Sequence, residues 1–337
     1  MTTALITGIT GMVGSHLADY LIQNTDWKIA GLLRWRSPLD NISHLIPSIN
    51  RQDRIQLMYG DLRDTLSIEK VVEDSRPDYV FHLAAQSNPK TSFDAPLDTL
   101  DTNIQGTVRV LDAVKRYSPN ARVHVCSSSE VFGRVPKEKL PIDEECTFHP
   151  ASPYAISKVG TDLVGRYYAE AFDLNIQTTR MFTHTGPRRG DVFAESSFAK
   201  QIALIEAGFI PPVVKVGNLD SLRTVADVRD AVDAYFKLLT IDPIAGAYYN
   251  IGGERVIRIS EILEYLMSLS HSPKGISFEV DKSRLRPIDA DLQIPNTEKF
   301  RKHTGWVPKY SFETTMNDLL NYWREKIGKQ GDIFTSR

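Results

Sequence analysis

Short runs of β-branched and apolar residues alternate with longer helical patterns through the first half of this chain, and that alternation restricts the fold more than any other feature. Strands joined by helices in this way pair in parallel, because a parallel connection needs a crossover of a dozen or more residues. Helices then cover both faces of the sheet. The expected strands are 4–6, 28–33, 55–59, 79–83, 122–127 and 176–180, and the expected helices are 15–23, 68–75, 107–117 and 154–172.

The pattern becomes less regular after Arg180. Helices are expected over 198–208, 225–239 and 312–326, with a short extended segment at 213–216. The sequence therefore predicts an α/β protein: a Rossmann-type doubly wound parallel sheet with a smaller C-terminal substrate-binding lobe. The main domain is expected to comprise residues 1–180 and about 225–250, and the lobe about 181–224 and 251–330.

Gly8, Gly11 and Gly14 follow the first expected strand and open the first helix. Glycines at such a turn let the backbone approach a pyrophosphate, whose charge is favoured at the N-terminus of the helix. The segment 8–14 therefore predicts a dinucleotide site. Further contacts are expected where later strands end, with Asp61-Leu62 at the adenine and Leu83-Ala84-Ala85-Gln86 along the dinucleotide.

The end of the second strand carries Arg34-Trp35-Arg36-Ser37. An enzyme that prefers NAD places an acidic residue here for the ribose 2′-hydroxyl. Guanidinium groups instead suit a phosphate, which they bind through two parallel hydrogen bonds. Arg34 and Arg36 therefore favour NADP over NAD, and a solvated basic loop is the alternative interpretation.

Tyr154 and Lys158 stand four residues apart on an expected helix and so share one face of it. The charge of Lys158 is expected to favour the phenolate and to lower the pKa of Tyr154 from its usual value of about 10. Such a phenol exchanges a proton with a sugar hydroxyl while a hydride moves to or from a nicotinamide. Ser128 and Glu130 add a hydroxyl and a carboxylate at the end of an upstream strand.

The charge balance argues against several other functions. A net charge of −2 and a pI near 6.5 give no basis for binding nucleic acid or a membrane surface. No apolar stretch approaches the length of a membrane span, and the N-terminal residues show no signal-peptide pattern, so a cytoplasmic location is expected. Cys126 and Cys146 have no metal-ligand spacing, nor do the lone histidines, so no metal site is expected.

Together these motifs resemble the extended short-chain dehydrogenase/reductase family over nearly the whole chain. The likeness rests on the glycine motif, Asp61-Leu62, His82-Leu83-Ala84-Ala85, Asn103, Ser127-Ser128-Ser129-Glu130 and the Tyr154/Lys158 pair. Within that family the chain resembles enzymes of GDP-sugars, both the GDP-mannose 4,6-dehydratases and the GDP-4-keto-6-deoxymannose reductases. It departs from the dehydratase pattern at Ser128, where they carry threonine, and at Thr183 and Thr185, where they carry asparagine and glutamate.

The resemblance implies a GDP-sugar 4,6-dehydratase acting on GDP-mannose or a GDP-heptose. The reaction comprises oxidation at C4, loss of water across C5 and C6, and return of the hydride to C6. The implied catalytic residues are Ser128, Tyr154 and Lys158, with Glu130 acting at C5 and C6. The alternatives are an NADPH-dependent reductase of GDP-4-keto-6-deoxymannose, a nucleotide-sugar epimerase, and a non-catalytic NADP-binding protein. A recycled cofactor would mark the dehydratase, and a consumed one the reductase.

The resemblance also implies the wider set of binding residues. The expected cofactor residues are Gly8, Thr10, Gly11, Met12, Val13, Gly14, Arg34, Arg36, Asp61, Leu62, Leu83, Ala84, Ala85, Gln86, Asn103, Tyr154, Lys158 and Met181. The expected substrate residues are Ser87, Ser128, Ser129, Glu130, Thr183, Arg188, Lys200, Val216, Asn218, Arg223 and Arg286.

Arginines dominate the candidates for the substrate diphosphate, because guanidinium groups bind phosphates through paired hydrogen bonds. The candidates are Arg188, Arg189, Arg223, Arg284 and Arg286. The expected partners are a GDP-sugar and tightly bound NADP, with no nucleic acid and no membrane, and the chain is expected to form a homodimer or homotetramer.

Overall fold

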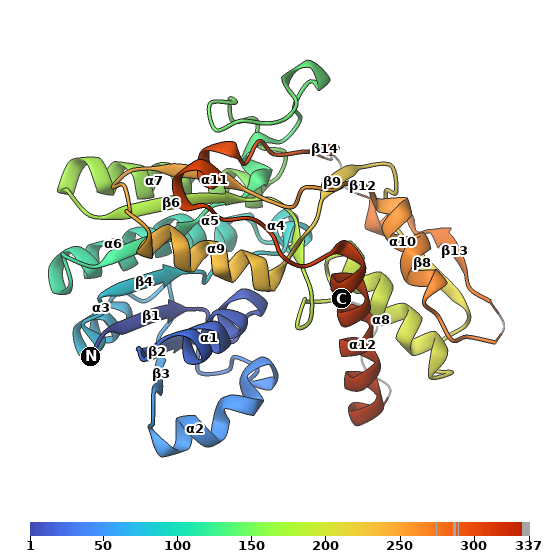
Figure 1. Ribbon diagram of the computed structural model, residues 1–337, viewed down its shortest axis with the longest axis horizontal. Coiled ribbons are helices and arrows are strands. Elements are labelled where there is room, and N and C mark those ends of the chain that lie inside the picture. Colours follow the sequence, from blue (N-terminus) through green and yellow to red (C-terminus); the bar gives the residue numbers. More distant parts are fainter. Residues whose placement is uncertain (274, 286–287, 289, 332–337) are drawn as a thin grey trace.

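The computed structural model describes residues 1–331 apart from 274, 286–287 and 289 (Figure 1). Within this part of the chain, seven parallel strands form one sheet in the order β11-β6-β5-β4-β1-β2-β3. The strand order reverses beside β1, which confirms the doubly wound Rossmann-type fold. The strands are β1 (Thr3–Thr7), β2 (Lys28–Leu33), β3 (Ile55–Tyr59), β4 (Tyr79–His82), β5 (Arg122–Cys126), β6 (Ile176–Met181) and β11 (Tyr248–Ile251).

Helices cover both faces of this sheet (Figure 1). One face packs against α1 (Met12–Asn24), α9 (Val228–Thr240) and α11 (Glu298–Thr304). The other packs against α3 (Thr65–Ser75), α6 (Gly106–Tyr117) and α7 (Pro153–Phe172). Each helix presents an apolar stripe to the sheet, and pairs four residues apart, such as Leu17 with Leu21 and Val110 with Val114, are fully buried.

A lobe lies beside the carboxyl ends of the strands (Figure 1). It contains α8 (Ala194–Glu206), α10 (Ile259–Ser268), α12 (Phe312–Gln330), β8 (Val213–Val216) and β13 (Ser277–Val280). These elements enclose one apolar core that includes Phe198, Leu263 and Trp323. Burying each such side chain contributes roughly 1.5–3 kcal/mol, so the lobe has a core of its own beside that of the sheet.

Short elements complete the described chain. The helical ones are α2 (Ile46–Arg51), α4 (Pro89–Asp94), α5 (Pro96–Leu100), a π-helical turn (Asp101–Gln105) and 3₁₀ turns at Asp40–Leu45, Ser129–Phe132, Lys137–Lys139 and Lys282–Arg284. The paired strands are β7 (His184–Thr185) with β10 (Ala226–Asp227), and β9 (Leu222–Thr224) with β12 (Val256–Arg258) and β14 (Leu292–Gln293).

The tail of the chain returns to the main sheet, although residues 251–330 are all expected in the lobe from sequence. Phe300 and Trp306 are fully buried in the core shared with α1 and α9. The indole nitrogen of Trp306 also donates to the carbonyl of Asp230, at 3.1 Å. Residues 298–306 therefore pack with the main domain, and the chain crosses to the lobe again at α12.

Candidate functional site

A cleft of about 1600 Å³ runs from the glycine turn to the lobe. The carboxyl ends of the strands form its floor, which is where ligands of open α/β sheets bind. Residues of the lobe, from α8 to the segment around Asn218, form the wall that faces the sheet. The cleft therefore joins the expected dinucleotide site to the expected substrate site in one continuous space.

The glycine turn leaves no room for side chains. Gly8 has φ +76°, and a Cβ there would stand 3.0 Å from the Cα of Ala84. A Cβ on Gly14 would stand 2.3 Å from the carbonyl oxygen of Gly8. The helix α1 that follows has no side-chain cap and no acidic residue in its first turn. This combination of a bare turn and an uncapped helix N-terminus fits the phosphates of a dinucleotide.

The end of β2 contributes Arg34 and Ser37 to the cleft, whereas Arg36 is exposed and does not line it. The backbone N–H of Arg34 donates to Ser37 Oγ at 3.2 Å, which closes a tight turn. Arg34 also stands near Asp61. Burial acts to raise the pKa of Asp61, but hydrogen bonds from Arg63 and the charges of Arg63 and Arg34 outweigh it and lower that pKa.

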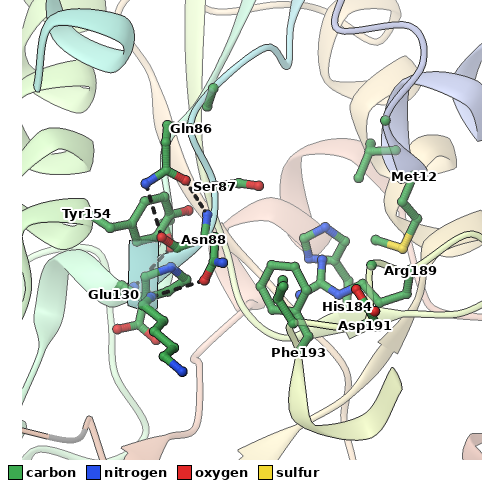
Figure 2. Close-up of a pocket in the computed structure, with 18 of the residues that line it drawn as sticks. Met12, Gln86, Ser87, Asn88, Glu130, Tyr154, His184, Arg189, Asp191 and Phe193 are labelled. Carbon is green, nitrogen blue, oxygen red and sulfur yellow. Dashed lines mark hydrogen bonds between the residues drawn. The ribbon is translucent and has the colours of Figure 1, made fainter. Parts of the chain in front are cut away.

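Asn103 acts behind the cleft wall rather than in it. Its side chain accepts from the N–H of Gln86 at 2.8 Å and donates to the carbonyl of Gln86 at 2.9 Å and to Ser157 Oγ at 2.8 Å. The side chain of Gln86 in turn bonds the backbone of Asn88, as Figure 2 shows. Asn103, which is expected to contact the cofactor, therefore fixes the loop after β4 to α7 because all of its polar atoms are already used.

The four expected catalytic residues all line the cleft. Tyr154 is the second residue of α7, which begins at Pro153 and is capped by Ser152, whose Oγ accepts from the N–H of Ala155 at 3.0 Å. Lys158 follows one turn later on the same face. Glu130 lies on the 3₁₀ turn after β5 and near Tyr154 (Figure 2), and Ser128, which caps that turn, lines the same cleft.

The electrostatics of Tyr154 differ from the expectation. Burial raises the pKa of Tyr154, while the hydroxyl of Ser128 and the charge of Arg189 act to lower it. Burial also lowers the pKa of Lys158, whose ammonium donates to the carbonyl of Cys126 at 2.7 Å. The prediction that Lys158 lowers the pKa of Tyr154 is therefore wrong for this structure. Spacing along a helix shows which side chains share a face, but it does not report how deeply both are buried.

The opposite wall of the cleft carries His184, Arg189 and Phe193 (Figure 2). The guanidinium of Arg189 lies 3.4 Å from the ring centroid of Phe193, and its Nε is 3.4 Å from a carboxylate oxygen of Glu195. The neighbouring Arg188 pairs with Asp19 of α1 at 2.7 Å. Both arginines line the cleft, but Arg188 is tied to the main domain while Arg189 faces the catalytic wall.

The lobe wall contains Lys200, Asn218 and Arg223. Lys200 pairs with Asp191 at 2.6 Å, and Arg223 donates to the main-chain carbonyls of Leu222 and Asp291 at 3.0 and 3.2 Å.

One expected substrate residue does not line this wall, and another lies outside the described residues. The side chain of Val216 is fully buried in the core of the lobe, because alternation along β8 turns Val214 and Val216 inward and Lys215 outward. Arg286 lies outside the described residues.

Some cleft residues carry no sequence signal. Asn41, on the 3₁₀ turn Asp40–Leu45, donates from Nδ2 to the carbonyl of Thr10 at 2.9 Å and so covers the glycine turn. Phe193 comes from an irregular loop. Among the described residues, no group of three histidines, cysteines or carboxylates is arranged to hold a metal, and no helix has the length and apolar character of a membrane span.

This fold and this cleft define a dinucleotide-binding enzyme of the extended short-chain dehydrogenase/reductase type, with a lobe for a second ligand. Comparison with known proteins narrows the class. The model of the GDP-mannose 4,6 dehydratase family matches residues 5–319, and the chain belongs to that family.

Two kinds of relative share this sequence. A GDP-mannose 4,6 dehydratase of Arabidopsis thaliana is 31% identical over 96% of this chain and 91% of its own length. A GDP-6-deoxy-D-mannose reductase of Pseudomonas aeruginosa is 29% identical over 96% of this chain and 98% of its own length. Among solved structures, RMD from Pseudomonas aeruginosa complexed with NADPH superposes with a TM-score of 0.81 at 27% identity, covering 97% of this chain and all of that one.

Proposed function

We propose that the protein is a GDP-sugar 4,6-dehydratase that converts GDP-mannose or a GDP-heptose into the 4-keto-6-deoxy sugar. The observation that carries the proposal is the presence of Glu130 beside Ser128, in the same cleft as Tyr154 and Lys158. Oxidation or reduction at C4 needs a proton donor and acceptor, but elimination of water needs a second base for the C5 proton. The family match and the dehydratase relatives support the same reaction.

The cofactor that fits this cleft is NADP. The bare glycine turn and the N-terminus of α1 would hold its pyrophosphate, Arg34 its 2′-phosphate, and Asp61 and Leu62 its adenine side. When bound, its nicotinamide would supply hydride chemistry, accepting a hydride from C4 and returning it at C6. We further propose that it stays bound through the cycle, since the reaction regenerates it.

The catalytic side chains divide the proton transfers between them. Tyr154 accepts the proton of the C4 hydroxyl as the phenolate, a form that the charge of Arg189 favours against the effect of burial, and Ser128 donates a hydrogen bond to the sugar oxygen. Lys158 lies one helical turn behind Tyr154 and contributes positive charge to that region. Glu130 removes the C5 proton and then donates it to the C6 hydroxyl, which leaves as water.

The lobe is proposed to bind the nucleotide part of the substrate. Lys200, Asn218 and Arg223 line its side of the cleft, with Arg188 beside α1 and with Thr183 and Ser87 nearer the sheet. Guanidinium and ammonium groups suit the diphosphate. We accordingly retain the division into a cofactor domain and a substrate lobe, with residues 298–306 added to the former.

Oligomer and location are proposed on other observations. The helices α5 and α7 lie against one another and carry exposed apolar side chains, including Leu97, Ile156, Leu163 and Tyr167. Such a patch fits a second copy of the chain, so we propose a homodimer. The two cysteines are unpaired, which suits the reducing cytoplasm, where GDP-sugar chemistry is proposed to occur.

One relative keeps a second candidate open, an NADPH-dependent reductase of a 4-keto sugar nucleotide. The match covers 98% of the length of the Pseudomonas aeruginosa reductase but 91% of the length of the Arabidopsis dehydratase. A reductase requires Tyr154, Lys158 and Ser128 but has no step for Glu130. The two candidates therefore differ in what Glu130 does.

The decisive experiment incubates the purified protein with GDP-mannose or a GDP-heptose and no added NADPH. A dehydratase yields a product lighter by one water, detected by mass spectrometry. Glu130→Gln should stop water loss while the C4 ketone still forms, so absorbance of reduced nicotinamide rises and persists. If no nucleotide sugar loses water while added NADPH is consumed with a 4-keto-6-deoxy sugar nucleotide, the reductase reading replaces the dehydratase.

A further inference from the structure

A buried ion pair joins the catalytic helix to the neighbouring strand. Arg180 of β6 is 1% exposed, and Asp162 of α7 is fully buried. Arg180 Nε donates to one carboxylate oxygen of Asp162 at 2.8 Å, and Nη2 donates to the other at 3.1 Å. The remaining terminal nitrogen, Nη1, donates to the carbonyl of Glu144 at 2.7 Å. One guanidinium therefore bonds α7 and the loop before it at the same time.

The same guanidinium lies against three aromatic rings. The distances from its central carbon to the ring centroids are 4.6 Å for Tyr248, 4.7 Å for Phe148 and 5.5 Å for Phe132. Contacts of a cation with ring faces at such distances are attractive, and more so when they are shielded from water. Phe132 is the important member of this group, because it closes the 3₁₀ turn that carries Glu130.

These contacts place Arg180 between the two halves of the catalytic group. Asp162 lies one turn beyond Lys158 and two turns beyond Tyr154 on α7, so it moves with both. Through Phe132 and Glu144, Arg180 holds the segment that begins with Glu130. It also precedes Met181, which lines the cleft. Arg180 is therefore one side chain that contacts both the helix of the phenol and the turn of the carboxylate.

Stability alone is a weak reason for such an arrangement. Removing two charges from water is expensive, and replacing a buried ion pair by apolar residues of similar volume is often neutral or stabilising. Geometry is the property that an apolar pair would not reproduce, because a guanidinium with directed bonds to three oxygens fixes orientation as well as distance.

We propose that Arg180 is a positioning residue that sets Glu130 relative to Tyr154, so that both proton transfers take place on one bound sugar. The proposal rests on the dehydratase function. Oxidation at C4 uses the nicotinamide cofactor as hydride acceptor and delivers the hydroxyl proton to Tyr154. Elimination then breaks the C5–H and C6–O bonds: Glu130 takes the C5 proton and passes it to the departing C6 hydroxyl, which leaves as water. With Glu130 displaced, the first step continues and the second slows.

The first test replaces Arg180 by lysine. A single ammonium keeps the charge beside Asp162 but does not bond both carboxylate oxygens and the Glu144 carbonyl together. Misplacement by about 1 Å costs on the order of 100-fold in rate, so water loss should fall by about that factor while C4 oxidation changes far less. In heavy water, deuterium uptake at C5 should fall with water loss. Amide hydrogen exchange should rise in residues 129–148, a readout that requires no turnover.

Two further variants control for folding and for charge. Arg166→Gln removes another cation beside the same carboxylate, since Arg166 Nη1 is 3.8 Å from Asp162. Arg166 also lies over Tyr248, at 4.1 Å from the ring centroid, but in the described chain it has no hydrogen bond, ion pair or ring contact with Glu144 or Phe132. It should keep the wild-type ratio of water loss to C4 oxidation. The double variant Asp162→Leu with Arg180→Met fills the site with apolar groups, and it should fold yet show the same altered ratio as Arg180→Lys.

The outcomes distinguish an error in the role of Arg180 from an error in the dehydratase function. An unchanged ratio in Arg180→Lys and in the double variant, with an active wild type, overturns the role of Arg180 alone. An equal loss of both steps in folded protein also overturns it, because that result indicates a purely structural residue. If wild-type protein removes water from no GDP-sugar, the dehydratase function fails and the Arg180 proposal fails with it.

Discussion

At the scale of single residues, Arg34 and Arg36 show what a sequence motif leaves undetermined: which of its side chains faces the cleft. The sequence places two guanidinium groups at the end of β2, and either suits a phosphate. Both side chains are exposed, but Arg34 lines the cleft near Asp61 and Arg36 does not. The turn 34–37 determines which side chain faces the cleft, and the residue types alone do not show which one it is.

This difference gives a prediction with a built-in control. Arg34→Gln should weaken the binding of NADP by roughly 1.5–3 kcal/mol, the contribution of a hydrogen bond to a charged group. The binding of NAD should be nearly unaffected. Arg36→Gln should have a much smaller effect on NADP. Titration calorimetry of both variants with both cofactors checks this. Equal losses in the two variants, or NAD as the cofactor recovered from purified protein, would contradict the assignment of Arg34.

The other site residues also divide into those that the sequence pattern locates and those whose position depends on the folded structure. Ser128, Glu130, Tyr154 and Lys158 are found together because each belongs to a strand end or a helix face whose direction the sequence fixes. Other assignments depend on what a polar atom bonds in three dimensions. Asn103 is predicted at the cofactor, yet its amide is fully used by Gln86 and Ser157. The pKa of Tyr154 likewise depends on burial, which residue spacing does not reveal.

At the scale of elements, the regular half of the chain is predictable from periodicity. The strands 28–33 and 55–59 are found where they are expected, and the helices differ only at their ends. The edge strand β11 was not predicted, because four residues beside a turn carry too little alternation. The helices α4 and α5 were also missed, since prolines at Pro89 and Pro96 interrupt the pattern and each helix is short.

The helix α7 has two functional faces. Its inner face carries Tyr154 and Lys158, and its outer face exposes Ile156, Leu163 and Tyr167 beside Leu97 of α5. Residues spaced seven and four apart on a helix form one stripe, and an apolar stripe in water indicates a covered surface. A second copy of the chain placed here would reach the helix that holds the phenol.

Leu163→Glu tests that interface. Burying a leucine contributes roughly 1.5–3 kcal/mol, and a symmetric contact involves it twice, so the charge should weaken the dimer by on the order of 100-fold or more. Sedimentation velocity should show a dimer for the wild type and a monomer for the variant. Val256→Glu, at an exposed valine of the lobe, is the matched control and should remain dimeric. If the wild-type protein is a monomer, the homodimer proposal is wrong.

At the scale of the whole molecule, the central sheet contains two buried histidines beneath the cleft. His82 of β4 bonds Thr7 and Thr107, and His124 of β5 bonds Thr179 and stacks near Tyr235. Burial, reinforced by the charge of Lys158, lowers the pKa of each to about 3. The same core that supports the catalytic strands therefore keeps both imidazoles neutral, and this has a consequence for acid stability.

The folded protein should lose stability as the pH falls below about 6.5. In the unfolded chain both histidines take up protons near their ordinary pKa of about 6.5, whereas the folded chain resists protonation until about pH 3. Between these values the unfolded state binds more protons, so the free energy of unfolding falls by about 1.4 kcal/mol per pH unit for each histidine. By about pH 5 the two together cost roughly 4 kcal/mol, a large part of a typical domain's stability.

Denaturant unfolding of wild type and His124→Phe at about pH 7 and pH 5 measures this contribution. The phenyl ring keeps the tilted ring contact with Tyr235 but does not titrate, so the variant should lose roughly 2 kcal/mol less than the wild type between these pH values. His16 and His184, whose pKa burial lowers to about 4, add to the loss in both proteins. Its stability at neutral pH falls somewhat because the hydrogen bond to Thr179 is removed. If the wild type is equally stable at both pH values, or if the variant loses as much as the wild type, the buried histidines do not govern the acid sensitivity of this fold.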